Sequence, residues 1–119
     1  MIERVILLSG PVSSGKSTLA RGLAQRYNMS ICKTSQLLQR RVTKELSRNR
    51  KVLQSQGDRL DRTTHGRWVL EALSTELRET PITTAMIVDS VRRVEQIQAI
   101  REAFGPIVIH VHLTAPLEE

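Results

Sequence analysis

The stretch Gly10–Ser17, with the sequence GPVSSGKS, restricts the fold of this chain more than any other part of it. It matches the phosphate-binding pattern G-x-x-x-x-G-K-[ST], in which two glycines let the backbone curl until successive N–H groups point at phosphate oxygens. The apolar run Arg4–Ser9 before it is typical of a buried strand, and Ser17–Tyr27 after it has the apolar spacing of a helix. The sequence therefore predicts a strand, loop and helix that hold a nucleoside triphosphate, with a plain glycine turn as the alternative.

Two side chains of this loop have expected tasks. Lys16 would reach the β and γ phosphates, and Ser17 would ligate Mg²⁺. The N-terminus of the next helix adds a partial positive charge that favours a bound anion. The residues predicted to bind the nucleotide are Gly10, Ser13, Ser14, Gly15, Lys16, Ser17 and Thr18.

The composition indicates one domain and a partner that carries phosphate. With 119 residues, 39% of them apolar, the chain can build one core, so we expect a single domain over residues 1–119. Only 3% of the residues are aromatic, which argues against base-stacking surfaces for single-stranded nucleic acid. The net charge of +6 fits a nucleotide or a phosphate polymer. Because the chain has no long run of like charge, nucleic acid is the less favoured of the two.

Cysteine usage and hydropathy predict a cytoplasmic protein. The single cysteine, Cys32, cannot form an internal disulfide, and we interpret it as a buried thiol in a reducing compartment. The first residues lead directly into a strand, without the pattern of a secretory signal. No apolar run approaches the ~18 residues that a membrane helix requires, so no membrane partner is expected.

Strands and helices alternate along the rest of the chain. Apolar runs predict strands at 30–34, 84–89 and 107–113. Helical spacing predicts three further helices: one that begins at Thr34 or Ser35, one from Thr63 or Thr64 to Glu79, and one over 94–104. The polar segment 47–61 is interpreted as a loop or frayed helix. This alternation predicts an α/β fold, with a parallel sheet flanked by helices and the ligand at its carboxyl edge.

Asp89 is the second strong signal, because it is a carboxylate at the end of an apolar strand. Proteins with a phosphate-binding loop hold the Mg²⁺ shell at such a position, although a strand-end Asp can also cap the following helix. Arg92 follows three residues later and suits bidentate capture of a second phosphate. It is favoured over Arg93, and surface placement is the alternative for both. The predicted catalytic residues are Lys16, Asp89 and Arg92, and the predicted metal ligands are Ser17 and Asp89.

A second substrate would sit opposite the triphosphate, beside the helix that follows the second strand. The predicted acceptor-binding residues are Thr34, Arg40 and Arg92, and further cations that could meet an acceptor phosphate are Arg41, Arg59 and Arg62. Each of these arginines alone is more often an ordinary exposed residue.

The histidines do not predict a metal site. His110 and His112 alternate on one face of the last predicted strand, but no third ligand stands at a suitable spacing. We interpret both as sheet residues that face a helix or a partner. His65 receives no role.

Three stretches together resemble the P-loop nucleoside-monophosphate kinases, in particular adenylate-kinase-like and deoxynucleoside-monophosphate-kinase-like members: Gly10–Ser17, Asp89–Arg92 and the final residues 112–119. The resemblance runs along the whole chain. It implies a strand order of 2-3-1-4-5, ATP as the phosphate donor with Mg²⁺, and an acceptor nucleotide held by the helical region at about 34–80. In that region, Thr34–Arg40 is similar to a degraded form of the family's Thr-Gly-Asp-x-x-Arg-like stretch.

The resemblance also implies an arginine-bearing lid and a final strand after Glu119, where this chain ends. We therefore expect a C-terminally incomplete domain that binds nucleotide better than it catalyses transfer alone, with the lid supplied by further residues or by a fused or partner domain. An uncovered sheet edge would favour homo-oligomers.

The leading hypothesis is a phosphotransferase. ATP with Mg²⁺ would donate its γ-phosphoryl group to a small phosphorylated acceptor, a nucleoside or deoxynucleoside monophosphate. A polynucleotide 5′-kinase is the nearest alternative among enzymes, and it would use the basic segment 47–62 to follow a strand. An ATP-binding sensor or assembly module with little turnover is the alternative from a different class.

Overall fold

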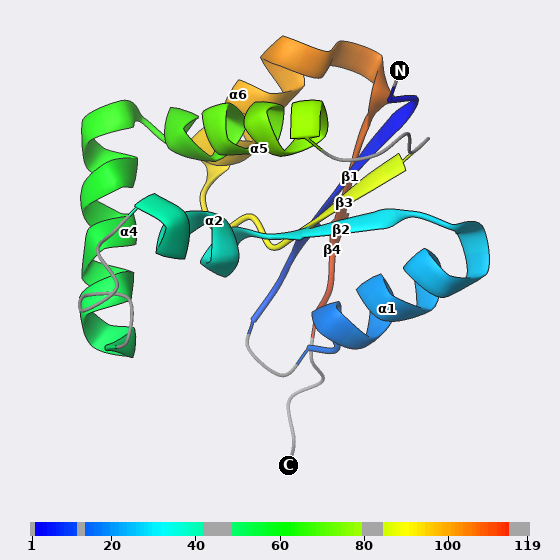
Figure 1. Ribbon diagram of the computed structural model, residues 1–119, viewed down its shortest axis with the longest axis horizontal. Helices are drawn as coiled ribbons and strands as arrows, with labels where there is room; N and C mark the ends of the chain where they lie inside the picture. The colour runs from blue at the N-terminus through cyan, green and yellow to red at the C-terminus, as the bar shows by residue number, and fades with distance from the viewer. Residues whose placement is uncertain (1, 12–13, 42–48, 80–84, 115–119) are drawn as a thin grey trace.

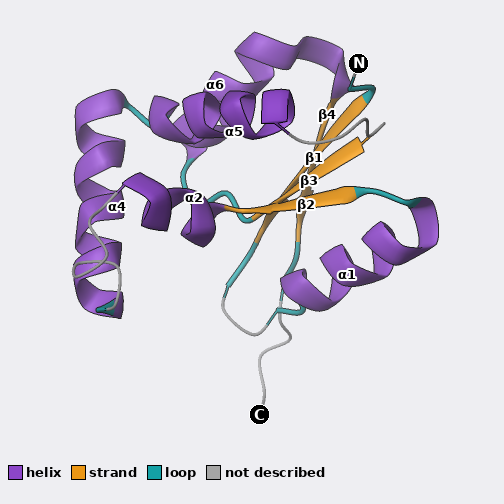
Figure 2. Cartoon of the chain, viewed as in Figure 1, coloured by secondary structure: helices purple, strands orange, loops and turns teal. Residues whose placement is uncertain are grey.

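The computed structural model describes residues 2–11, 14–41, 49–79 and 85–114, and they contain a four-stranded parallel sheet (Figures 1 and 2). The strands are β1 Arg4–Ser9, β2 Ser30–Lys33, β3 Ala85–Asp89 and β4 Val108–His112. Their order is β2-β3-β1-β4. The parallel sheet with its helices confirms the predicted fold class, and the order of these four strands agrees with the one that the resemblance implies.

Helices cover both faces of the sheet. They are α1 Lys16–Tyr27, α2 Thr34–Arg41, α4 Arg50–Thr64, α5 Arg67–Glu79 and α6 Val94–Phe104, followed by the short 3-10 helix η1 Gly105–Ile107. In Figure 2, α1 lies on one side of the sheet and α5 and α6 lie together on the other. Helix α4 stands beside α2 and α5, away from the strands (Figure 1).

The alternation of side chains along β1 divides the core into two clusters. Ile6 and Leu8 face α1 and pack with Ala20, whereas Val5 and Leu7 face α5 and α6. A strand that is buried on both faces reads as a continuous apolar run, which is why the sequence signal for β1 and β3 is so clear. Packing from both sides fixes the carboxyl ends of these two central strands.

Of the two interpretations of 47–61, the loop is wrong from residue 50 onward, because these residues form most of the regular helix α4. The first residues of this segment, 47 and 48, lie outside the described part of the chain. The Asn49 side chain caps the helix, since its Oδ1 accepts the N–H groups two and three residues later at 3.0 and 3.2 Å. Leu53 and Leu60, seven residues apart, pack against the core. This narrow apolar stripe outweighs the polar composition that favoured a loop.

The helix predicted to begin at Thr63 or Thr64 begins at Arg67 instead. Helix α4 continues to Thr64, and the next two residues turn the chain with left-handed backbone angles, φ 54° and 79°. The Thr64 Oγ1 still accepts the N–H of Trp68, in the first turn of α5, at 3.2 Å. The helix was therefore predicted, but the turn that separates it from α4 was missed.

Cys32 is buried in β2, as predicted. Burial, with a smaller contribution from the negative charge of Glu76, raises the pKa of the thiol to about 12. The thiol is therefore protonated at neutral pH and is a poor nucleophile. The other strand boundaries differ from prediction by a residue, since Thr34 begins α2 and the last strand covers 108–112.

We predict that Gly66→Ala destabilises the fold more than Gly105→Ala. Both glycines have positive φ, but a Cβ at Gly66 would lie 2.7 Å from the backbone nitrogen of Gln96, whereas nothing lies within 4 Å of one at Gly105. The free energy of unfolding should fall by about 2–4 kcal/mol for Gly66→Ala and by about 1 kcal/mol for Gly105→Ala, as measured by urea denaturation. Equal losses would contradict a tight contact between the start of α5 and the start of α6.

Candidate functional site

The carboxyl edge of the sheet brings the predicted phosphate-binding loop and Asp89 together. Strands β1 and β3 pair in parallel with Leu8 opposite Asp89, so the loop that leaves β1 starts beside this carboxylate. The hydroxyl of Ser17, in the first turn of α1, donates to Asp89 Oδ2 at 3.1 Å. Two residues 72 positions apart in the sequence are thus in direct contact at one end of the sheet.

The two glycines of the loop have backbone angles that side chains would oppose. A Cβ at Gly10, where φ is 141°, would lie 2.4 Å from the carbonyl oxygen of Leu113, just after β4. Gly15 is the N-cap of α1 with φ 91°, and it has no side chain that could accept the first N–H groups of the helix. Two other residues were predicted to bind the nucleotide: Thr18 is exposed in the first turn of α1, and Ser13 lies outside the described residues. The first N–H groups of α1 therefore face the loop without a capping side chain, as anion-binding helix termini do.

Two polar side chains of the loop are arranged as an anion site requires. Lys16 Nζ donates to the carbonyl oxygens of Gly10 at 2.6 Å and Pro11 at 2.8 Å, so its ammonium group lies over the loop. Ser14 Oγ is buried and has no hydrogen-bond partner among the described residues. A buried hydroxyl without a partner is costly, and a phosphate oxygen would satisfy it. These residues fit a bound polyphosphate.

The oxygens of Ser17 and Asp89 fit Mg²⁺. A hydroxyl and a carboxylate oxygen 3.1 Å apart are the hard ligands that this ion prefers, and it usually completes its shell with water and substrate phosphate. No group of three or more His, Cys, Asp or Glu side chains that could hold a metal occurs within the described ranges.

The loop that joins β3 to α6 is held along its length. Thr34 Oγ1 donates to the carbonyl oxygen of Ser90 at 2.8 Å and accepts its N–H at 3.3 Å. The N–H of Val91 donates to a carbonyl oxygen of β1 at 2.8 Å, and the N–H of Arg92 donates to Gln96 Oε1 at 2.8 Å. The start of α2, strand β1 and helix α6 thus fix the backbone that carries Arg92.

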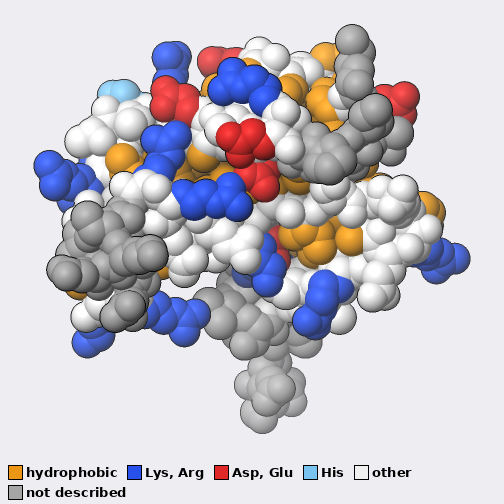
Figure 3. Space-filling model, in the orientation of Figure 1, with side chains coloured by type: hydrophobic (Ala, Val, Ile, Leu, Met, Phe, Trp, Pro, Cys, Tyr) orange, Lys and Arg blue, Asp and Glu red, His pale blue; other side chains and the backbone are white. Residues whose placement is uncertain are grey.

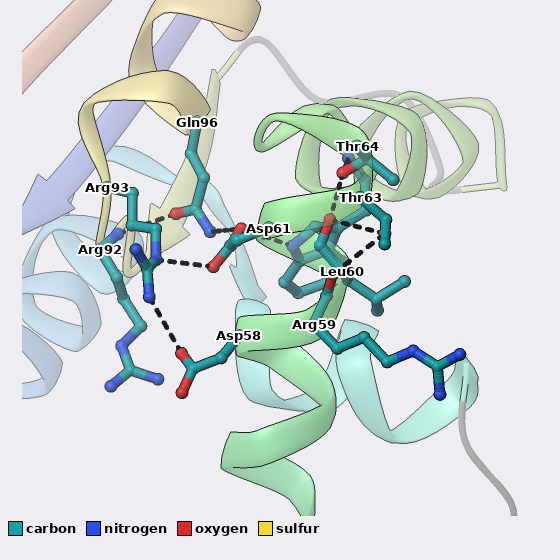
Figure 4. Close-up of polar contacts among 10 residues, drawn as sticks. Asp58, Arg59, Leu60, Asp61, Thr63, Thr64, Arg92, Arg93 and Gln96 are labelled. Atoms are coloured by element: carbon teal, nitrogen blue, oxygen red, sulfur yellow. Dashed lines mark hydrogen bonds and ion pairs between the residues drawn. The ribbon is translucent and has the colours of Figure 1, made fainter.

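Arg92 and Arg93 differ in their partners. The Arg93 guanidinium lies 3.1 Å from the carboxylates of both Asp58 and Asp61 (Figure 4). Its hydrogen bond to Asp58 and the charge of Asp61 raise the pKa of Arg93 further above its ordinary value. Arg92 is exposed and its side chain forms no ion pair with any described residue. The arginine that the sequence favoured for phosphate binding is the one whose charge is available.

The other predicted acceptor cations have ordinary surroundings. Arg40 pairs with Glu76 at 2.5 Å, and Arg41 lies 3.9 Å from a second glutamate of α5, so both join α2 to α5. Arg59 and Arg62 are exposed on α4. Figure 3 shows Lys and Arg side chains spread over several elements of this face with acidic ones between them. Among the described residues visible on this face, they form no continuous track of the kind that a nucleic acid strand follows.

A polar cluster at the end of β1 was missed by sequence reasoning. Ser9 Oγ lies 2.6 Å from His110 Nε2 and 2.8 Å from His112 Nδ1. Both rings lie on the sheet face that α6 covers, as predicted for residues that face a helix. One hydroxyl has one hydrogen, so at least one ring must donate its N–H to Ser9. Only the pairing of β1 with β4, which sets Ser9 opposite His112, could have identified the cluster.

A strand, a glycine-rich loop and a helix at the carboxyl edge of a parallel sheet define the P-loop class of nucleotide-binding proteins. The model of the adenylylsulphate kinase family matches residues 3–119, so the chain belongs to this family and is a P-loop kinase enzyme. This confirms the predicted P-loop kinase class, but it does not single out the nucleoside-monophosphate kinases within it. A search of curated proteins finds no match. Among the helices that the structure describes, none is long and apolar enough to cross a membrane.

We predict that His110 makes the fold less stable in mild acid. Burial, the positive charge of Arg101 on α6 and the neighbouring His112 lower the pKa of His110 below its ordinary 6.5. The unfolded chain therefore binds the proton more readily than the folded chain does. The contribution of His110 to the free energy of unfolding is present above pH 6.5 and is lost as the pH falls through the lowered pKa. The melting temperature should drop less between pH 7.5 and pH 5.5 in His110→Gln than in the wild type. The exposed control His65→Asn should behave like the wild type, and an unchanged drop in His110→Gln would refute the prediction.

Proposed function

We propose that this P-loop kinase transfers the γ-phosphoryl group of ATP to a small nucleotide, a nucleoside or deoxynucleoside monophosphate. The observation that carries the proposal is a single sheet edge, where the loop 10–17, the Ser17–Asp89 contact and the exposed Arg92 follow two neighbouring strands. Phosphoryl transfer depends mainly on positioning and on positive charge around the transferred group. This edge can supply both.

On the donor side, the loop amides and the Ser14 hydroxyl would bind the phosphates, together with Gly10, Gly15 and Thr18. Lys16 would exchange its bonds to loop carbonyl oxygens for bonds to phosphate oxygens. Charged oxygens are the stronger acceptors for an ammonium group, so bound ATP would draw Lys16 off the loop. For Ser13 the support is the sequence pattern alone.

Ser17 and Asp89 would hold the Mg²⁺ that accompanies ATP. When bound, this ion neutralises phosphate charge and so assists the transfer. The hydrogen bond from Ser17 to Asp89 keeps the two oxygens at one place, which reduces the rearrangement that ion binding requires.

On the acceptor side, Arg92 would bind the phosphate of the second nucleotide. Its backbone is anchored while its guanidinium is exposed and unpaired with any residue described, and a fork of N–H groups suits a phosphate. Thr34 would act through Ser90, to which its hydroxyl is bonded. Arg40 is the weaker candidate because Glu76 already neutralises it.

Adenylylsulphate is the second candidate acceptor, and the family match favours it. It too is a nucleotide with a 5′-linked anionic group that Arg92 could bind. The two candidates are distinguished by incubating the protein with Mg·ATP labelled at the γ-phosphate and a panel of AMP, CMP, GMP, UMP, dTMP and adenylylsulphate. A labelled product from one acceptor identifies the substrate. ATP binding without any labelled product would reject both candidates in favour of a binding module.

We predict that Lys16→Ala lowers the kcat/KM for phosphate transfer by at least about 100-fold, because a charge that stabilises the transferring phosphate is lost. The exposed residue Lys51, on α4, gives a matched control, and Lys51→Ala should retain the wild-type rate. Circular dichroism should show both variants folded. Unchanged turnover in Lys16→Ala would reject the role assigned to this lysine.

For Arg92→Ala we predict a rise in the KM for the acceptor of roughly 10- to 100-fold, since charge-assisted hydrogen bonds to its phosphate disappear. The KM for ATP should change little. Arg26→Ala, on the exposed side of α1, should leave both values unchanged. A rise in the KM for ATP instead would place Arg92 on the donor side.

A further inference from the structure

We propose that Gln96 is a positioning residue for Arg92, and that Asp61 links it to the acceptor-side helix α4. The proposal rests on the proposed function, because it concerns how Arg92 is held for an acceptor phosphate. The residues involved, Asp61, Trp68, Arg93 and Gln96, form a connected group between α4, α5 and the start of α6 (Figure 4), which we call the Asp61 cluster.

Both the oxygen and the nitrogen of the Gln96 side-chain amide form hydrogen bonds. Gln96 is only 2% exposed, its Oε1 accepts the backbone N–H of Arg92 at 2.8 Å, and its Nε2 donates to Asp61 Oδ1 at 2.8 Å. A glutamine can accept and donate at the same time, whereas a leucine can do neither and an ionised glutamate can only accept. The side chain at this position therefore connects the Arg92 backbone to α4 through two hydrogen bonds.

Asp61 is the centre of the cluster. Its Oδ1 accepts Trp68 Nε1–H at 2.8 Å as well as the Gln96 amide, and its Oδ2 lies 3.1 Å from Arg93 Nε. The side chain is 8% exposed, yet three donors satisfy its two oxygens. Gly66 allows the close approach, because a Cβ there would lie 2.7 Å from the Gln96 nitrogen.

The Asp61 cluster contacts two adjacent arginines in different ways. Arg93 is committed to Asp61 and Asp58, while the Gln96 amide holds the backbone of Arg92 and leaves its guanidinium exposed. Apolar residues of similar volume often stabilise a fold as well as a buried ionic group does, so stability alone is a weak explanation for this arrangement. A fixed Arg92 backbone, which sets the point and the direction from which the side chain extends, accounts for it, and this backbone is coupled to the helix beside which the acceptor would lie.

The test compares Gln96→Leu and Gln96→Glu with the matched controls Gln98→Leu and Gln98→Glu, since Gln98 is exposed on the same helix. Kinetics are measured with Mg·ATP and whichever acceptor of the panel the wild type uses, and calorimetry measures the affinity for AMP. In Gln96→Leu the KM for the acceptor should rise about tenfold or more, while the KM for ATP changes less than about twofold. Both controls should match the wild type.

Gln96→Glu provides a second test, because a loss of packing alone would not make the acceptor KM depend on pH. The carboxylate of the introduced glutamate can still accept the Arg92 N–H. Its other oxygen, however, would face the Asp61 carboxylate, whose other partners are Trp68 and Arg93. Two facing carboxylates favour a shared proton, which restores the missing donor in acid. The ratio of the variant's acceptor KM to the wild-type value should be close to one at pH 5.5 and should rise to about tenfold at pH 8.

The outcomes separate this inference from the proposed function. If the wild type transfers phosphate and Arg92→Ala raises the acceptor KM, but the Gln96 variants differ from the wild type only in melting temperature, the positioning role is wrong and the proposed function stands. If the wild type neither uses nor binds any acceptor of the panel, both are overturned. A flat pH ratio for Gln96→Glu would also overturn the positioning role, even if Gln96→Leu failed to fold.

Discussion

The parallel pairing of β1 with β3 is the constraint on which the rest of this site depends. It sets Leu8 opposite Asp89, so the phosphate-binding loop and the strand-end carboxylate leave the sheet side by side. Side chains of both strands pack against helices on the two faces of the sheet, which helps to fix the ends of the strands. The hydrogen bond between Ser17 and Asp89 is a consequence of that register, and a slip of one residue would turn the carboxylate to the other face of the sheet.

The two loops at this edge differ in how their polar groups are bonded. The loop after β3 is tied to the start of α2 by Thr34, to β1 by a backbone hydrogen bond, and to α6 by Gln96. In the phosphate-binding loop, by contrast, the Ser14 hydroxyl has no partner in the described structure, and Lys16 bonds only to carbonyl oxygens. A polyphosphate ligand would give the Ser14 hydroxyl a partner and the Lys16 ammonium a charged one.

The sequence predicted the elements whose signals are local. The apolar runs of the central strands and the loop 10–17 could be identified without knowing the fold, and Asp89 followed from the rule that ligands bind at the carboxyl edge of a parallel sheet. Helix α4 was predicted only as a loop or frayed helix, because its apolar stripe is narrow and its stability comes from packing against distant residues. The Ser9 and Asp61 clusters were missed for a similar reason, since strand register and helix packing, not spacing, bring their members together.

The central claim is that the loop 10–17 and Asp89 together bind a nucleoside triphosphate with magnesium. Titration calorimetry of the folded protein with ATP, first with Mg²⁺ and then with the ion chelated, tests it most directly. We expect clear heat of binding with Mg·ATP, a weaker affinity without the ion, and a smaller difference between the two titrations when Asp89 is replaced by Ala. Absence of binding heat at millimolar Mg·ATP, in protein shown to be folded, would mean that this sheet edge does not bind a nucleoside triphosphate.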